Sequence, residues 1–155
     1  MRIELSGISY SHGKRKKKRH AAETAPILRH VDWTVESGEM AAVAGRSGSG
    51  KSTLLQLIKG FYPPGGGILR LDGIDPHAGK RPELFDRIGY VFQYPEHQLF
   101  AATVAEDVGF GLRYAGLTQE EKDDRIRRAL EAVGLDRDTF AQRSPLELSG
   151  GEKRR

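Results

Sequence analysis

Nine residues with three glycines, Gly45–Thr53 (GRSGSGKST), constrain the fold of this 155-residue chain more than any other segment. They fit the pattern of a phosphate-binding loop: glycine, four residues, then glycine, lysine and serine. The apolar run Met40–Ala44 before them suits a buried strand, and Thr53–Lys59 after them has apolar residues at helical spacing. Strand, loop and helix in this order predict a P-loop fold of the α/β class rather than a flexible Gly/Ser turn.

The residue types in this loop fit the chemistry of a bound triphosphate. Glycines allow successive backbone N–H groups to turn inward at the start of a helix and form a concave anion site. Lys51 can reach the outer phosphates, and the Ser52 hydroxyl can ligate a Mg²⁺ ion that bridges them. The residues expected to bind the nucleotide are Gly45, Arg46, Ser47, Gly48, Ser49, Gly50, Lys51, Ser52 and Thr53.

A second glycine-containing segment, Leu148–Arg155 (LSGGEKRR), closes the chain. Ser149, Gly150 and Gly151 offer a hydroxyl and backbone N–H groups directly before a charged run that can be helical. The pattern indicates a second phosphate-binding element. Taken alone, it is equally typical of a plain helix cap with a Gly-Gly turn.

With Gln93 between them, these segments resemble the nucleotide-binding subunits of ABC transporters, in that family's order. Gly45–Thr53 matches the Walker A motif, Gln93 matches the Q-loop glutamine that contacts Mg²⁺, and LSGGE matches the signature motif. The usual fifth signature residue is glutamine, where Glu152 stands here. The resemblance implies an ATPase in which ATP held by one subunit is capped by Ser149–Glu152 of a second ABC ATPase subunit, identical or different.

The run Val91–Gly111 narrows the resemblance to the ATPase subunits of energy-coupling factor importers, which take up vitamins or cobalt and nickel ions. In that family a short helix after the glutamine docks on an integral membrane coupling protein, and Tyr94–Phe100 stands at that place. The alternative is an ordinary connection in which Leu99 and Phe100 pack into a core. The transported substrate would contact a separate membrane subunit, so this sequence does not identify it.

The resemblance also places the Walker B carboxylates and the switch histidine beyond the signature motif. No residue of this chain can then take a catalytic role, and we expect an incomplete C-terminal half of the domain. Without the water-positioning carboxylate, we expect the chain alone to bind ATP poorly and to hydrolyse it negligibly. In that family the strand beside the phosphate-loop strand also follows the signature, so we expect the chain alone to aggregate.

Composition and charge exclude several classes of function. Without cysteine, the chain has no disulfide, thiolate metal site or cysteine nucleophile. No apolar run approaches the length of a membrane span and no signal peptide is recognisable, so we expect a cytoplasmic protein. The resemblance implies that it is peripheral on the inner face of the membrane, through a partner. The six cations of Lys14–Arg19 account for more than the whole net charge of +4. This block suits a solvated loop between strands, or alternatively a contact with anionic lipid, and we expect no nucleic-acid partner.

Two other functions use the same phosphate loop. A DNA-maintenance ABC ATPase would need long coiled coils between Gln93 and Ser149, and no sustained heptad pattern occurs there. A P-loop small-molecule kinase would have no use for a phosphate cap supplied by a partner. Both remain alternatives.

Three regions are expected along the chain: an antiparallel β layer over 1–39, a P-loop core with the Q-loop over 40–100, and a helical subdomain ending in the signature over 101–155. The strands of the layer are Arg2–Tyr10 and Ile27–Glu36, and a buried strand over Ile88–Phe92 delivers Gln93. An Asp72-Gly73 turn follows the short strand Ile68–Leu71.

Local signals also place one helix and the base-binding group. Thr118 and Glu121 form a capping box, and Gly134 ends the helix that it starts. Core-facing residues of this helix are Ile126, Leu130 and Val133. By resemblance, the adenine ring stacks on an aromatic residue where the first strand ends, and the sequence offers Tyr10 and His12 there. The family's position falls on His12, and the alternative for Tyr10 is a strand residue packed in the core.

Overall fold

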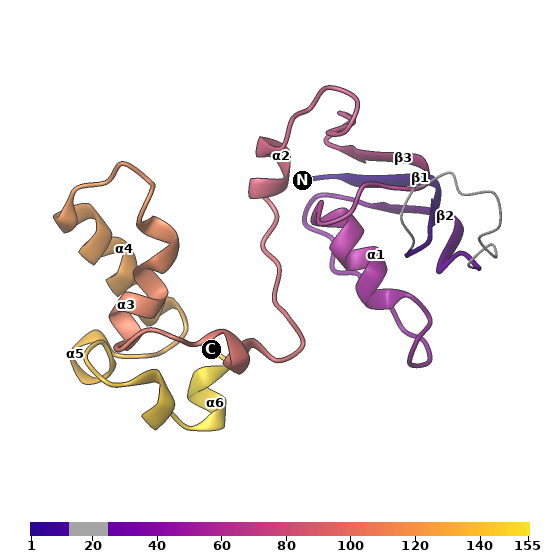
Figure 1. Cartoon of the computed structure of the whole chain (residues 1–155). Coiled ribbons are helices and arrows are strands. Elements are labelled where there is room, and N and C mark those ends of the chain that lie inside the picture. The colour runs from indigo at the N-terminus through magenta and orange to yellow at the C-terminus, as the bar shows by residue number, and fades with distance from the viewer. Residues whose placement is uncertain (13–24) are drawn as a thin grey trace, which may run out of the picture. The chain divides into compact units, whose positions relative to one another are not determined.

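The structure, a computed structural model, describes residues 1–12 and 25–155 and divides into two units, Met1–Tyr90 and Val91–Arg155 (Figure 1). Each unit has its own hydrophobic core. The expected basic loop, Lys14–Arg19, lies outside the described residues.

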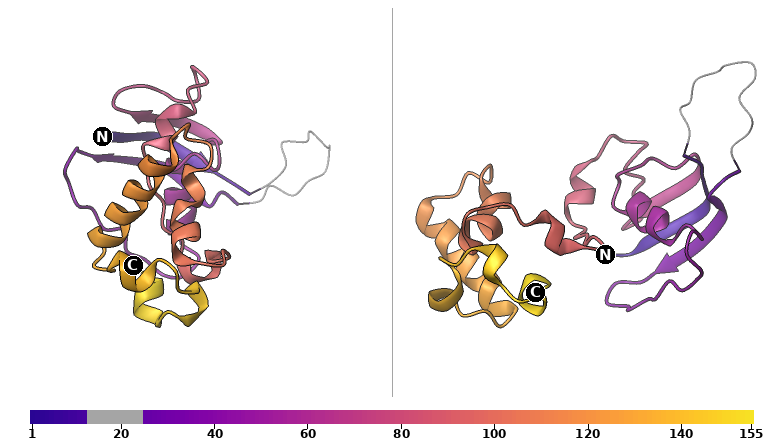
Figure 2. Two further views of the ribbon diagram at one scale, coloured as in Figure 1. Left: turned by 90° about the vertical axis from the view of Figure 1, so that its left-hand side faces the viewer. Right: turned by 60° about the horizontal axis from the view of Figure 1, so that its bottom comes forward.

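An antiparallel sheet in the order β2-β1-β3 forms the centre of the first unit. Its strands are β1 (Ile3–Tyr10), β2 (Leu28–Val35) and β3 (Gly66–Leu71), and its helices are α1 (Lys51–Ile58) and α2 (Glu83–Asp86). Leu5 on β1 pairs with Trp33 on β2 and with Leu69 on β3. Helix α1 covers one face of the sheet, where its Leu57 is fully buried in a shared core (Figure 2). The expected α/β class with an antiparallel β layer is confirmed.

The turn after β3 has the conformation that its sequence predicts. Asp72 and Gly73 have φ angles of 50° and 80°, so both central residues are left-handed, as a type I′ turn requires. Leu71 and Ile74 exchange two backbone hydrogen bonds across it, of 2.9 and 3.0 Å. The Asp72 carboxylate in addition accepts the Arg2 N–H at 2.7 Å. The turn thus ties β3 to the start of β1.

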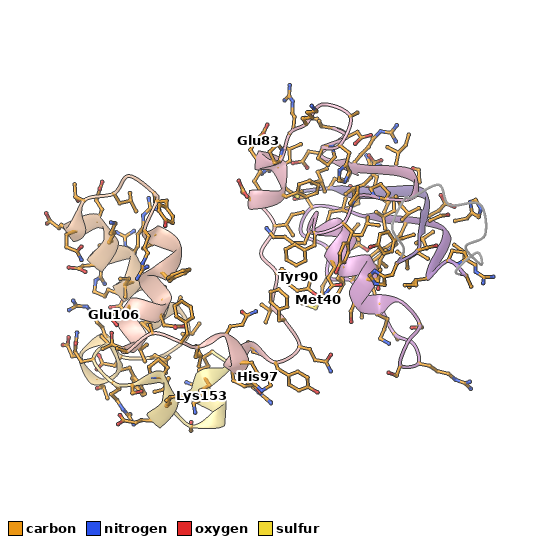
Figure 3. The ribbon with its side chains drawn as sticks, viewed as in Figure 1. Met40, Glu83, Tyr90, His97, Glu106 and Lys153 are labelled. Carbon is orange, nitrogen blue, oxygen red and sulfur yellow. The ribbon has the colours of Figure 1, made fainter. Side chains whose placement is uncertain are left out.

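Two expected strands are absent, and these predictions were wrong for this structure. Met40–Ala44 and Ile88–Phe92 have no strand hydrogen bonding. Met40, which is labelled in Figure 3, is 98% exposed, and Val91 is 82% exposed. A buried parallel strand needs ladder partners beside it, because unpaired N–H and C=O groups are costly away from water. No other segment of the described chain forms a sheet ladder with either run. Met40–Ala44 is exposed throughout, whereas Ile88 of the second run packs against the core of the first unit.

Helices make up the second unit, and α3 and α4 lie side by side in it (Figures 1 and 2). The helices are α3 (Val104–Gly109), α4 (Gln119–Ala132), α5 (Arg137–Phe140) and α6 (Gly150–Lys153). Single 3-10 turns occupy Pro95–Gln98, Phe110–Leu112 and Pro145–Glu147. The buried core consists of Val104, Leu130, Leu135, Ala141 and Leu148.

Helix α4 begins and ends as its sequence predicts. Thr118 and Glu121 form the capping box, and Gly134 follows the helix with a φ of 71°. Leu130 is buried, and Ile126 packs against the core. Val133 was wrongly expected in the core: it follows the last helical residue and is 37% exposed, because the backbone turns away there.

Within the described residues, no helix has the length and apolar character that crossing a membrane requires.

Candidate nucleotide-binding site

The phosphate-loop segment leads directly into α1 in the first unit. Gly50 is the N-cap residue of this helix, and its φ of 92° is left-handed, a conformation that favours glycine. A Cβ atom on Gly50 would lie 3.1 Å from side-chain carbons of both Ile27 and Leu28. Gly48, with a φ of 79°, is also left-handed. At position 50 the loop therefore needs glycine for conformation and for space.

The Lys51 side chain folds back over this loop. Its ammonium group donates hydrogen bonds to the carbonyl oxygens of Gly45 and Arg46, each 2.8 Å long. In the described part of the chain it forms no ion pair with a carboxylate. A cation held at the N-terminal end of a helix, where the helix itself carries positive partial charge, attracts an anion. The arrangement suits the outer phosphates of a nucleotide.

The other loop residues surround the same turn. Ser52 is exposed in the first turn of α1, so its hydroxyl is accessible, whereas Thr53 is only 9% exposed. The Ser49 N–H donates to the Arg46 carbonyl at 3.2 Å. Among the residues described, no cluster of three or more His, Cys, Asp or Glu could hold a metal ion. Within the first unit, Ser52 could ligate a metal ion here together with oxygens of the ligand, a donor set that Mg²⁺ accepts.

Gln93 belongs to the second unit, whereas the phosphate loop belongs to the first. It lies in an exposed segment without regular secondary structure, and its Nε2 donates to the Tyr94 hydroxyl at 3.5 Å. The Tyr94 ring stacks on His97, with ring centroids 5.5 Å apart. Tyr94–Phe100, the segment expected to dock on a membrane protein, contains a single 3-10 turn at Pro95–Gln98.

Ser149 and Glu152 form a capping box at the start of α6. The Ser149 hydroxyl accepts the Glu152 N–H at 3.3 Å, and the Glu152 carboxylate accepts the Ser149 N–H at 2.7 Å. Hydrogen bonding of the Glu152 carboxylate to the Ser149 side chain, and secondly to the Ser149 backbone N–H, lowers the pKa of Glu152. Gly150 and Gly151 are exposed, and Leu148 anchors the segment in the core. The signature segment therefore exposes two glycines at a helix start that the capping box holds in place.

An ion pair that sequence reasoning missed joins this segment to the 3-10 turn before α3. Arg154 donates to the Glu96 carboxylate at 3.4 Å, over 58 positions of sequence. No local pattern signals such a pair, because the two residues meet only through the packing of the unit.

The two aromatic candidates for stacking lie together, and a third ring joins them. Tyr10, at the end of β1, is partly buried, and its hydroxyl lies 3.2 Å from Nδ1 of the exposed His12. Sequence reasoning missed Tyr62, whose ring centroid is 5.4 Å from that of Tyr10 and 5.5 Å from that of His12. A signal was available: in an antiparallel pairing of β1 with β3, residues just before β3 lie beside those just after β1.

Comparison with known protein families matches residues 28–155 to the family described as ABC transporter. An energy-coupling factor transporter ATP-binding protein, EcfA2 of Clostridium acetobutylicum, is 45% identical over 130 residues. That match covers 83% of this chain and 46% of the relative. The chain spans about half the length of the curated relatives it matches.

Two solved structures are similar to the chain as a whole. cbiO1 of Clostridium perfringens, part of the ABC transporter complex cbiONQ, has a TM-score of 0.79 and 30% identity, covering 98% of this chain and 57% of that one. A dimeric post-hydrolysis state of the ATP-binding cassette MJ0796, bound to ADP and Pi, has a TM-score of 0.76 and 28% identity. This second match covers 97% of the present chain and 65% of that one.

Proposed function

This chain belongs to the ABC transporter family, and from that premise we propose that it is the ATP-binding part of an energy-coupling factor importer. The importer couples ATP binding and hydrolysis to the uptake of a vitamin or a transition-metal ion. The observation that carries the proposal is the Lys51 ammonium, folded over the carbonyls of Gly45 and Arg46 at the start of α1 without a carboxylate partner in the described chain.

Different residues of the chain bind different parts of the triphosphate. Backbone N–H groups of Gly45–Thr53 hold its oxygens at the start of α1, and Lys51 neutralises charge on the outer phosphates. By the family resemblance, the exposed Ser52 hydroxyl and Gln93 would ligate a Mg²⁺ ion. Bound Mg²⁺ supplies charge neutralisation between the phosphates. No residue of 1–155 is assigned a catalytic role, so this part of the protein binds, orients and caps the nucleotide.

A second ABC ATPase subunit completes the site with Ser149, Gly150, Gly151 and Glu152. The capping box supports this role because it fixes the start of α6, where the two glycines are exposed. Glu152 replaces the usual glutamine with a negative charge. The Glu152 carboxylate accepts the backbone N–H of Ser149 at 2.7 Å, and this hydrogen bond holds its negative charge at the N-terminal end of α6. The replacement is thereby compatible with a nearby triphosphate.

The membrane-embedded coupling subunit docks on Tyr94–Phe100. Tyr94 and Phe100 are 54% and 65% exposed, which favours docking over packing of this segment into a core. The relative cbiO1 is part of a complex with further transporter components. The chain then lies on the inner face of the membrane and meets the substrate-binding membrane subunit indirectly.

Titration of the full-length protein with Mg-ATP tests the proposal. We expect Lys51→Ala to weaken binding at least about tenfold, because a charge-assisted hydrogen bond contributes roughly 1.5–3 kcal/mol. The matched control is Lys122→Ala, which removes a lysine from α4 in the other unit and should leave the affinity unchanged. Equal affinities for the Lys51→Ala variant and the parent protein would overturn the proposal.

A further inference from the structure

Three aromatic rings converge where β1 ends: Tyr10, His12 and Tyr62. The His12 ring stands nearly perpendicular to both tyrosine rings, at 87° and 84°, with centroid distances of 5.1 and 5.5 Å. The two tyrosine rings are tilted by 31° and lie 5.4 Å apart. Edge-to-face contacts at these distances are favourable. The tyrosines therefore hold one side of the imidazole, and the rest of it is exposed.

This ring cluster is connected to the phosphate loop through Ile27, the residue directly before β2. Ile27 donates its backbone N–H to the Tyr10 carbonyl at 2.7 Å. The carbonyl oxygen of the same residue lies 3.2 Å from where a Cβ atom on Gly50 would be. Ile27 therefore contacts both the start of α1 and the end of β1. This closeness places the rings on the side of the phosphate loop where the base of a bound nucleotide is expected.

The hydroxyl of Tyr10 fixes the orientation of the imidazole. Partial burial, and Tyr62 beside it, raise the pKa of Tyr10, so its hydroxyl keeps its proton and can donate. Its partner at 3.2 Å is Nδ1 of His12. When this hydroxyl donates, a neutral His12 ring carries its proton on Nε2. The ring is thus held by a hydrogen bond on one edge and by Tyr62 on another.

Space for a ligand lies next to the cluster. A cavity of about 450 Å³ is lined by Tyr10, Ser11 and Pro63 among others. Its volume is within the range of small-molecule sites, and its walls combine apolar rings with hydroxyl groups. The cluster and the cavity share Tyr10.

We propose that Tyr62 is a positioning residue for base recognition: with Tyr10 it braces the His12 ring, on which the purine of the bound nucleotide stacks. The inference rests on the proposed function, since it takes the phosphate loop as the site of the triphosphate. It assigns a role to a residue between α1 and β3 that lies outside every motif of the sequence. Tyr62 acts through His12, and its loss affects the base without affecting the phosphates.

Affinities of the full-length protein for Mg-ATP and for Mg-tripolyphosphate, which lacks a base, test this role. We expect Tyr62→Ala to weaken ATP binding about fivefold, the lower end of what stacking of one base contributes, and to leave tripolyphosphate binding unchanged. Tyr62→Phe retains the ring and should restore the ATP affinity. Tyr114→Ala removes a tyrosine that is 96% exposed in the other unit, and is the matched control.

Two results would overturn the inference. One is an unchanged ATP affinity of Tyr62→Ala, and the other is an equal loss for ATP and tripolyphosphate, because a residue that acts through the base cannot weaken a ligand without one. If Tyr62→Ala does not fold, Tyr62→Leu is measured against the same two ligands. Lys51→Ala separates the two proposals: it should weaken both ligands, and if it weakens neither, the proposed function itself fails.

Discussion

Gly50 is the residue on which the local geometry of the phosphate loop depends most directly. Its left-handed φ of 92° and the 3.1 Å approach of Ile27 and Leu28 both act against a side chain. We expect Gly50→Ala to lower the free energy of unfolding by about 1–3 kcal/mol, the usual range for a strained left-handed residue. Denaturant unfolding of the full-length protein measures this. Gly111→Ala, where a Cβ atom meets nothing within 4 Å, should change stability little, and equal effects would contradict the argument.

Asp72 makes stability depend on pH. The Arg2 N–H, and secondly the Arg87 guanidinium at 2.9 Å, lower the pKa of its carboxyl group. A carboxyl group with a lowered folded-state pKa stabilises the fold above its unfolded-state value of about 3.9 and loses this contribution as pH falls through the folded-state value. Asp72→Asn keeps the turn, because asparagine also adopts positive φ, and removes the charge.

We therefore expect unfolding midpoints of Asp72→Asn to fall less steeply than those of the parent protein as pH drops below about 4. Denaturant unfolding at several pH values makes the comparison. Asp138→Asn, whose side chain is 91% exposed in α5, is the control and should retain the parent slope. Identical slopes for Asp72→Asn and the parent would show that the turn carboxylate has no such role.

At the scale of elements, the capping box decides where α4 begins. Thr118 accepts the Glu121 N–H at 3.3 Å, and Glu121 accepts the Thr118 N–H at 2.8 Å. We expect Thr118→Ala to lower the free energy of unfolding by about 1 kcal/mol, because a helix N–H loses its acceptor. Thr118→Ser keeps the hydroxyl and should preserve most of that stability. The prediction fails if the alanine and serine variants unfold at the same denaturant concentration.

At the scale of the whole molecule, two runs that read as buried strands form no strand in the described chain and expose apolar residues. Met40 and Val91 are 98% and 82% exposed, and neither run has a ladder partner in the described chain. Exposed apolar side chains on segments outside a sheet ladder promote association. We expect residues 1–155, expressed alone, to aggregate, and Met40→Lys with Val91→Lys to reduce the aggregated fraction in light scattering. Tyr114→Lys, at an exposed site outside both runs, should not. A soluble parent chain that melts cooperatively as a monomer would refute this.

Features that depend on a few neighbouring residues could be predicted from the sequence. The left-handed Asp72-Gly73 turn, the capping box of Thr118 and the glycine that ends α4 follow from backbone conformation and from hydrogen bonds that span about one turn. The nucleotide roles of Gly45–Thr53 stay predictions of the same local kind, because successive residues provide both the cradle and the cation.

Tertiary structure decided what distant residues make together. The strands expected at Met40–Ala44 and Ile88–Phe92 needed partners elsewhere, and without a ladder in the described chain their apolar patterns form no strand. Tyr62 reaches His12 only because β3 pairs with β1, and Arg154 reaches Glu96 only through packing of the second unit. The sequence by itself therefore determined the turns and helix caps, because hydrogen bonds between near neighbours fix them. Strand formation and contacts between distant residues were decided by pairing and burial in the tertiary structure.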